Sequence, residues 1–354
     1  MRLHQHTAAA AAALLTVSAH AQSSITLGGI VDGGAYQRKL AGETRINAVQ
    51  GGLMSMSRID IKGVEDLGGG NVAIFELSPH FRLDTGEAGR HPGDAAANRF
   101  FTRASWVGLR GKPGTLRIGR IPTGGYVQTL RFTPFEDSTF LGPFMMHTFV
   151  GSQPMLASRN SDGSWSNSIV YNSPSVAGFN TQLQYSLNEA SGNGRRIEAT
   201  MNYSNQKFAA AVSHGRITGA AYTVPRTRTD PAGTPYIAEQ ETSTIASVSY
   251  NFTVAKVYAQ FASARLQPRG TTEISLQTLA LNAEAPMGPG RIIAGWARTE
   301  REQAGTMDRT RSTATIGYDY ILSKRTDWYT ALIHDRATNL ASGTGVATGI
   351  RHRF

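Results

Sequence analysis

The chain has 354 residues and no cysteine, with 35 Lys and Arg against 25 Asp and Glu and 40% hydrophobic residues. The lack of cysteine excludes disulfide scaffolds, thiolate metal sites, iron–sulfur clusters and cysteine nucleophiles. Outside the N-terminus, no stretch approaches the roughly 18 apolar residues of a membrane helix, which excludes a helical membrane protein but not one that spans the membrane with alternating strands.

Residues 1–21 predict a secretory signal peptide. Arg2 and two nearby histidines form a cationic head, residues 8–17 an apolar core, and Ala19-His20-Ala21 a small-x-small end. We expect cleavage before Gln22 and a single mature domain, residues 22–354. Cleavage removes one basic residue and no acid, so the mature chain keeps 34 basic and 25 acidic residues, a net charge of +9. The protein is therefore expected to be exported.

Along the mature chain, apolar and polar residues alternate with a period of two. The pattern is clearest in residues 179–187, 197–203, 246–252 and 313–320, where apolar side chains hold one parity and polar side chains the other. Successive side chains of a strand point to opposite faces. Each segment therefore predicts a strand with one apolar and one polar face.

Two kinds of connection separate these strands. Seven short breaks rich in Gly, Asn, Ser and Pro, as reverse turns require, lie at residues 65–70, 111–114, 173–178, 205–207, 251–254, 285–290 and 322–324. Eight longer polar connections lie near residues 39–52, 85–97, 121–162, 189–194, 217–240, 266–270, 300–308 and 337–343. Together they separate sixteen strands. Short turns at one end and long loops at the other are typical of an outer-membrane barrel.

A soluble β-sandwich is the competing fold, because its strands alternate as well. Sixteen amphipathic strands would make an unusually large sandwich and would expose two broad polar sheets. In a barrel the apolar parity meets lipid, the polar parity meets a water-filled lumen, and closure pairs every backbone group. The last strand puts Phe354 on the apolar parity, as suits a closing strand whose terminal ring lies at the bilayer interface.

Six stretches form a series that runs from the first mature residues to the last. They are residues 23–34, 57–70, 102–111, 114–120, 322–329 and 349–354, and the specific segments are K-G-V-E-D-L-G-G-G at 62–70 and L-S-K-R-T-D at 322–327. In this order they resemble the Gram-negative general porins of the β-proteobacterial type. The resemblance implies a sixteen-stranded antiparallel transmembrane β-barrel, a homotrimer, whose third loop folds inward to narrow the pore.

The resemblance also implies a constriction in which basic residues of the wall oppose acidic residues of the inward loop. It assigns the basic wall to Arg58, Arg103 and Arg159. It assigns the acidic side to Glu136 and Asp137, which follow Thr133-Pro134-Phe135 in the third loop, residues 121–158.

Alternation supports an inward direction for the strand residues of this site. By parity the inward residues are Arg58, Asp60, Lys62, Glu76, Arg103 and Arg351, with Arg351 a lesser lining residue near the end of its strand. For Arg103 the inference takes Ala104 and Trp106 as the outward parity. An arginine that faces lipid at the bilayer midplane costs about 2–4 kcal/mol, so strand arginines should face the lumen. Like charges in a narrow aperture concentrate ions of the opposite sign.

The aromatic residues fit the same picture. Several fall near strand ends, as interfacial girdles require: Trp106, Tyr171, Tyr185, Tyr203, Tyr250 and Trp328. No G-x-S-x-G, H-E-x-x-H or phosphate-binding motif occurs, the histidines lack metal-ligand spacing, and the basic residues are dispersed. These observations argue against an enzyme, a metal or other cofactor, and nucleic-acid binding.

The sequence predicts an outer-membrane porin for passive diffusion of small hydrophilic solutes and ions, with a mild preference for anions. Expected partners are the other subunits of a homotrimer, outer-membrane lipid and lipopolysaccharide, and the barrel-assembly machinery through Phe354. Two alternatives remain: an outer-membrane barrel enzyme of the phospholipase or protease type, and a secreted soluble β-rich binding protein.

Overall fold

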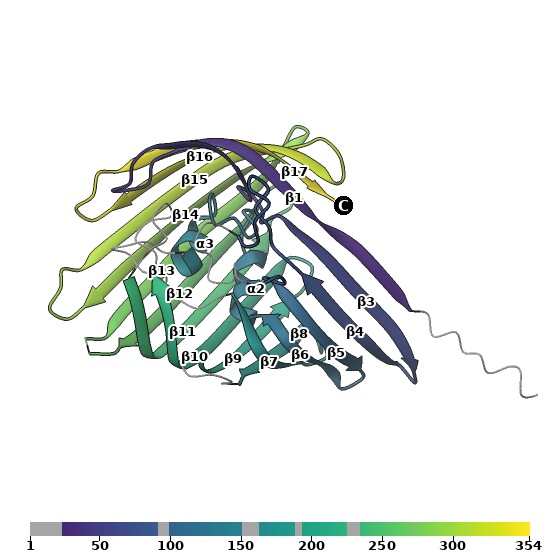
Figure 1. Ribbon diagram of the computed structural model, residues 1–354. Coiled ribbons are helices and arrows are strands. Elements are labelled where there is room, and N and C mark those ends of the chain that lie inside the picture. The colour runs from purple at the N-terminus through teal and green to yellow at the C-terminus, as the bar shows by residue number, and fades with distance from the viewer. Residues whose placement is uncertain (1–22, 91–98, 151–162, 188–192, 225–233, 271) are drawn as a thin grey trace, which may run out of the picture.

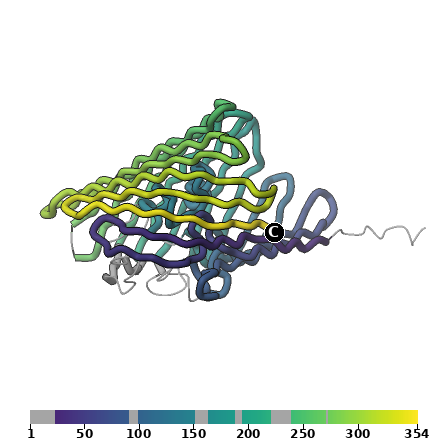
Figure 2. Tube along the Cα trace, turned by 90° about the horizontal axis from the view of Figure 1, so that it is seen from above, coloured from purple at the N-terminus to yellow at the C-terminus, as the bar shows by residue number. Residues whose placement is uncertain are grey.

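A computed structural model describes residues 23–90, 99–150, 163–187, 193–224, 234–270 and 272–354. The predicted signal peptide, residues 1–21, and Arg159 lie outside these described residues. In the described part, 17 strands form one antiparallel sheet whose first strand, β1 (Ser24–Arg38), pairs with its last, β17 (Gly343–Arg353). The sheet is therefore closed, and the two ends of the chain run side by side in the wall (Figures 1 and 2).

The strands follow one another around the barrel in sequence order, and consecutive strands are paired except for β2 and β3. The remaining ones are β2 (Ile46–Gly51), β3 (Arg58–Gly68), β4 (Asn71–Ser78), β5 (Ala104–Gly111), β6 (Gly114–Pro122), β7 (Ser164–Asn172), β8 (Phe179–Ser186), β9 (Asn193–Ser204), β10 (Phe208–Val224), β11 (Thr234–Asn251), β12 (Lys256–Pro268), β13 (Ile274–Met287), β14 (Gly290–Gln303), β15 (Arg309–Ile321) and β16 (Thr326–Ala337).

Two of these strands are halves of one barrel strand. β2 pairs with residues 33–38 of β1 and β3 with residues 24–30, so the two lie end to end along the same neighbour. Residues 52–57, here called the insert, interrupt them. Counted this way, 17 strands make a 16-stranded antiparallel barrel, which confirms the predicted fold.

All seven predicted short turns are present, but strands reach into several predicted loops, most extensively into two of them. Residues 46–51 form β2, and β10 and β11 pair far into the region 217–240, up to Val224 opposite Thr234. The polar composition of the β10–β11 hairpin predicts a loop. Beyond the apolar band of the barrel, however, a strand does not contact lipid, so a segment without an apolar face can still be a strand.

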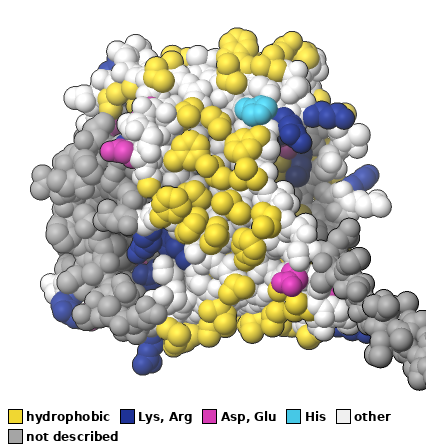
Figure 3. Space-filling model, turned by 45° about the vertical axis from the view of Figure 1, so that its right-hand side comes forward, with side chains coloured by type: hydrophobic (Ala, Val, Ile, Leu, Met, Phe, Trp, Pro, Cys, Tyr) yellow, Lys and Arg dark blue, Asp and Glu magenta, His cyan; other side chains and the backbone are white. Residues whose placement is uncertain are grey.

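The outward face is apolar and exposed. Ile197 is 57% exposed, Ile316 55% and Leu183 50%, and each holds the apolar parity that the sequence assigns to lipid. Figure 3 shows such side chains gathered in a broad field on one outer face. A protein that keeps these side chains in water would lose about 25 cal/mol for each Å² of apolar surface, whereas hydrocarbon accepts them. Within the described residues, no helix is long and apolar enough to cross a membrane.

The interior holds the third long connection, here called the inner loop, residues 123–150. It contains α2 (Gly124–Arg131), α3 (Pro143–Met145) and the π-helical turn η1 (Met146–Val150), and Figure 1 shows α2 and α3 within the ring of strands. Thr123 caps α2, because its Oγ1 accepts a hydrogen bond from the N–H of Tyr126 at 3.1 Å. The inward fold predicted for this loop is thus present.

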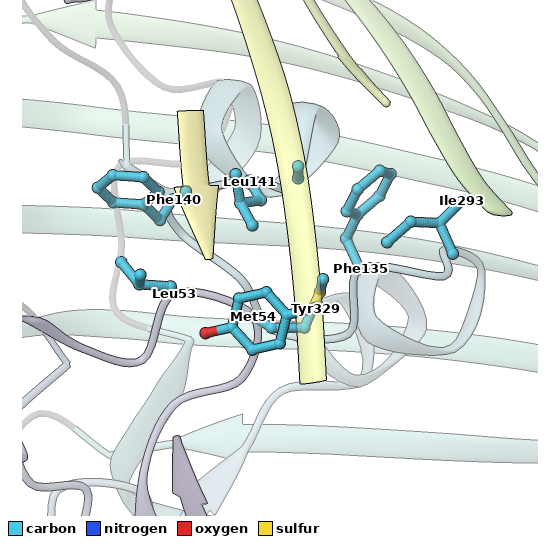
Figure 4. Close-up of a cluster of buried hydrophobic side chains, with 9 residues drawn as sticks. Leu53, Met54, Phe135, Phe140, Leu141, Ile293 and Tyr329 are labelled. Carbon is cyan, nitrogen blue, oxygen red and sulfur yellow. The ribbon is translucent and has the colours of Figure 1, made fainter. Parts of the chain in front are cut away.

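The inner loop packs on an apolar part of the lumen wall. Phe144 is buried among Ala262, Ala280 and Ala297 of β12–β14. Figure 4 shows Phe135, Phe140 and Leu141 of the loop beside Leu53 and Met54 of the insert. The prediction of a uniformly polar lumen parity is therefore wrong on this side. On this part of the lumen wall, small and aliphatic residues take the place of polar ones because the inner loop, and not water, contacts the wall.

Candidate functional site

Asp32 of β1 holds the insert in place beneath the inner loop. Its carboxylate accepts hydrogen bonds from the backbone N–H groups of Leu53 at 3.1 Å, Met54 at 3.3 Å and Ser55 at 3.0 Å. Tyr329 of β16 donates a fourth bond at 2.7 Å. Asp32 is buried, and four donors satisfy a carboxylate that would otherwise be costly to bury.

The insert in turn carries the inner loop. The Ser138 hydroxyl donates to the carbonyl of Leu53 at 2.5 Å, and the Met56 N–H donates to the Asp137 carboxylate at 2.9 Å. These bonds place residues 136–138 of the loop directly against the wall that bears Arg58. The two acids predicted for the loop side of the constriction lie in this stretch.

Glu136 is bound by two arginines of the last strand. It has a φ of 48°, a left-handed conformation that residues other than glycine seldom hold. Its carboxylate lies 3.0 Å from Arg351 Nη1 and 2.5 Å from Arg353 Nη2, and accepts a bond from the Ser55 hydroxyl at 2.8 Å. Burial alone would raise the pKa of Glu136, but Arg351 and Arg353 outweigh it and hold this pKa below its usual range.

Asp137, the second loop acid, is fully buried and faces Arg58. The Arg58 Nη1 lies 3.8 Å from its carboxylate, while Met56 supplies a backbone hydrogen bond. Burial raises the pKa of Asp137, and Arg58 offsets this only in part, so the net shift is upward. The wall and loop charges that the sequence sets against each other therefore meet at this pair.

Four wall residues and the loop acid Asp137 form one connected network, here called the constriction cluster: Arg58, Asp60, Glu76, Arg103 and Asp137. Arg58 Nε lies 3.1 Å from Asp60, and Arg103 Nη1 lies 2.5 Å from Glu76 and 3.7 Å from Asp60. Ser78 donates to Asp60 at 2.5 Å. The structure thus brings together five of the predicted residues, and it pairs their charges.

Further cations on the inner side are not neutralised in this way, among them Lys62, Arg117 and Arg131. Lys62 is exposed and makes no ion pair with any residue that the structure describes. Arg117 of β6 lies 5.1 Å from the Trp106 ring and donates to Asn172 at 2.8 Å. Arg131, at the end of α2, donates to Asn202 at 3.4 Å. Lys62 was predicted, whereas Arg117 and Arg131 were missed, although the alternation of Leu116, Arg117 and Ile118 would have revealed Arg117.

Two sequence predictions need correction here. Trp106 faces inward beside Arg117, whereas its neighbours Val107 and Leu109 face outward. The inference from parity assumed the reverse, because it extended the alternation of β5 back to Arg103, which precedes the strand.

Arg351 was expected to line the pore, but only 1% of its side chain is exposed. It lies 3.0 Å from Glu136, 3.0 Å from Asp327 and 3.4 Å from Asp319. The inner loop covers it, so it anchors the loop rather than meeting solutes. Alternation along a strand predicts that Arg351 faces the lumen, but it cannot show that the inner loop covers the side chain.

His147 fixes the far end of the inner loop. Its Nδ1 lies 2.8 Å from the Thr299 hydroxyl and its Nε2 lies 2.8 Å from the Thr313 hydroxyl, so one ring nitrogen donates and the other accepts. Burial, followed by the charge of Arg311, lowers the pKa of His147 to about 3. The ring is therefore neutral at neutral pH. Within the described ranges no three His, Asp or Glu side chains lie close enough to hold a metal ion.

Comparisons with known proteins agree with this geometry. A family model described as Gram-negative porin matches residues 7–340. The chain is 31% identical to outer membrane porin protein 32 of Delftia acidovorans, over 95% of this chain and 96% of that protein. The solved anion-selective porin from Comamonas acidovorans superposes with a TM-score of 0.76 at 26% identity, covering 94% of this chain and all of that one. A trimer form of OmpT from Vibrio cholerae, at 12% identity and a TM-score of 0.70 over 94% and 99% of the two chains, shares the fold.

Proposed function

The chain belongs to the Gram-negative porin family and is an outer-membrane channel protein, and from this premise we propose that it passes small hydrophilic solutes and ions with a mild preference for anions. The proposal extends to the absence of enzymatic activity and to export by the signal peptide, residues 1–21.

The observation that carries the preference is an imbalance between paired and open charges. Glu136 is engaged by Arg351 and Arg353, and Asp137 faces Arg58, so neither loop acid is left to attract cations. Lys62, Arg117 and Arg131 remain without acidic partners at hydrogen-bond distance in the described part of the chain. Positive charges in a narrow, partly dry aperture raise the local concentration of anions.

The preference should be mild because the constriction cluster is nearly self-neutralised. Arg58 and Arg103 face three acids, Asp60, Glu76 and Asp137. This refines the prediction based on three wall arginines and two loop acids: we assign the net field to the open cations instead. Arg159 keeps its assignment to the basic wall as a proposal, as it lies outside the described residues.

The solved porin that is titled anion-selective supports this sign, because its likeness covers nearly the whole chain. The trimeric relative supports assembly as a homotrimer, which we also propose. For insertion, we propose recognition of Phe354 by the barrel-assembly machinery. Phe354 directly follows β17 and exchanges two backbone hydrogen bonds of 3.2 Å with Gly29, at the seam where the barrel closes.

Swelling of vesicles that contain the purified trimer tests the function. We expect rapid swelling in a small neutral sugar, and faster swelling in glutamate than in lysine, two amino acids of similar size and opposite net charge. Swelling no faster than in protein-free vesicles would contradict a channel. Faster swelling in lysine would contradict the anion preference while leaving the channel in place.

A further inference from the structure

Two arginines lie on the outside of the barrel, toward the end with the long loops. In the register of the sheet, Arg216 of β10 is directly opposite Thr242 of β11, and Thr242 is directly opposite Arg265 of β12. Opposed residues of antiparallel strands point to the same face. Arg216 shares its parity with Val212 and Arg265 with Phe261, both of which are exposed to lipid. All three residues, here called the outer triad, therefore face away from the pore.

The outer triad lies just beyond the apolar band. Val212, Ala246 and Phe261 form one register row of the outward face, and His214, Thr244 and Ser263 form the next. The triad is the row after that. The outward surface thus changes from apolar to polar to cationic over four residues of strand. The apolar row and the outer triad are about 14 Å apart along the strand. This is the level of lipid headgroups.

The same arrangement occurs a second time. Ser312 of β15 lies between Arg298 of β14 and Arg336 of β16, again on the outward parity. Trp296, one row nearer the membrane centre, donates its indole N–H to the Ser312 hydroxyl at 2.8 Å. Tryptophan is enriched where hydrocarbon meets headgroups. The repeat of arginine, hydroxyl and arginine places both sets at the same boundary.

The first set lacks a counter-charge. Arg265 makes no hydrogen bond or ion pair with the described residues, and Arg216 donates to a neutral partner, the Gln240 side chain. In the second set Arg298 is 3.0 Å from Glu300, so the charge of Arg298 is partly neutralised. Two exposed arginines that have no acidic partner among the described residues, two strands apart, offer a site for an anion from outside the chain.

We propose that the outer triad binds a phosphate group of an outer-leaflet glycolipid whose acyl chains lie on the apolar rows below. Neighbouring strands are about 4.8 Å apart, so the two arginine backbones lie about 10 Å apart and their side chains can converge on one tetrahedral anion. Guanidinium groups bind phosphate with two parallel hydrogen bonds, and the Thr242 hydroxyl is a further donor between them. The adjoining lipid surface favours a lipid phosphate over a soluble one. This inference rests on the outer-membrane location and not on the ion preference.

Native mass spectrometry of the purified channel in detergent tests the inference without any ion flux. The probe is bisphosphorylated lipid A, and the variant is R216Q/R265Q. The matched control is R325Q, which removes a charge at the opposite, short-turn end of the barrel. We expect R216Q/R265Q to bind lipid A at least tenfold more weakly than the wild type, and R325Q to bind as the wild type does. Lipid A without phosphates should bind the wild type and R216Q/R265Q equally.

Three outcomes would overturn the inference. Equal binding of lipid A by the wild type and R216Q/R265Q would remove the arginines from a lipid site. Inorganic phosphate that binds as tightly as lipid A, with the same dependence on the arginines, would make it a site for soluble anions. Loss of the trimer in R216Q/R265Q with unchanged lipid binding would place the arginines between copies of the chain. The conservative R216K/R265K variant, which keeps the charge and should keep part of the affinity, controls for folding.

Discussion

Tyr329 of β16 reaches across β17 and donates a hydrogen bond of 2.7 Å to Asp32 of β1. The strand between them carries Gly349, which is in register with Tyr329 on one side and Gly34 on the other. A Cβ atom at Gly349 would come within 2.4 Å of the Tyr329 oxygen. Glycine therefore opens the path by which the last strands lock the first strand and, through Asp32, the insert beneath the inner loop.

The first prediction concerns this lock. Gly349→Ala should displace the Tyr329 ring and break its bond to Asp32, which leaves a buried carboxylate short of a donor and costs about 1–3 kcal/mol. Semi-native gels should show the folded band disappearing at a lower temperature. Tyr329→Phe keeps the ring and removes only the hydroxyl, so it should lower stability less than Gly349→Ala. If both variants melt as the wild type does, the lock does not contribute to stability.

The second prediction separates anchoring arginines from open cations. Arg351→Gln should destabilise the barrel by about 3–5 kcal/mol, because it strips a buried partner from Glu136, Asp319 and Asp327. Lys62→Gln should change the folded state by less than about 0.5 kcal/mol, since Lys62 is exposed and unpaired among the described residues. Urea unfolding of both variants in detergent measures the difference. Similar losses of stability would show that Arg351 is not an anchor.

The third prediction is a pH dependence of ion selectivity that originates in Asp137. Its pKa is raised by burial, so as the pH falls Asp137 takes up a proton before an ordinary aspartate would, and its negative charge beside Arg58 is lost. Glu136 stays charged in that range because Arg351 and Arg353 lower its pKa. Anion preference should therefore rise as the pH falls. Asp137→Asn should show the higher preference already at neutral pH and a weaker pH response. If Asp137→Asn showed the same pH response as the wild type, the pH dependence would originate in a group other than Asp137.

The fourth prediction concerns His147. Its pKa is about 3 in the folded protein and about 6.5 in an unfolded chain, so between these values the unfolded state binds the extra proton. Stability should therefore fall as the pH drops from about 6.5 toward 3, by up to several kcal/mol from this residue. His147→Gln, which can bond both threonine hydroxyls without titrating, should lose less stability over this range. Equal acid sensitivity of the wild type and His147→Gln would contradict the assignment.

The barrel could be predicted because its outward face has a periodicity of two that no other part of the fold disturbs. Leu183, Ile197 and Ile316 face hydrocarbon whatever fills the lumen, and the short turns need Gly, Asn and Pro for purely local reasons. Closure follows from the backbone's need for partners in lipid. These features depend on neighbouring residues, so one sequence is enough to recover them.

The interior of the barrel was harder to predict, because its structure depends on contacts between segments that are far apart in the sequence. Ala262, Ala280 and Ala297 hold the lumen parity, yet only the fold shows that Phe144 covers them. Arg351 also holds the inward parity, but its burial depends on Glu136, which lies far away in the sequence. The facing of Arg58 and Asp137 was predicted from the family resemblance, whereas the pairing that mutes their charges became visible only in the structure.

The reversal potential of single channels in a planar bilayer under a KCl gradient shows which ion the pore favours. We expect a sign that favours chloride, and a shift toward zero in K62Q/R117Q/R131Q. R58Q should shift the potential less than that variant does, because it removes one positive charge rather than three. A wild-type potential that favours potassium would contradict the anion preference, and an unchanged potential in K62Q/R117Q/R131Q would show that these three cations do not produce it.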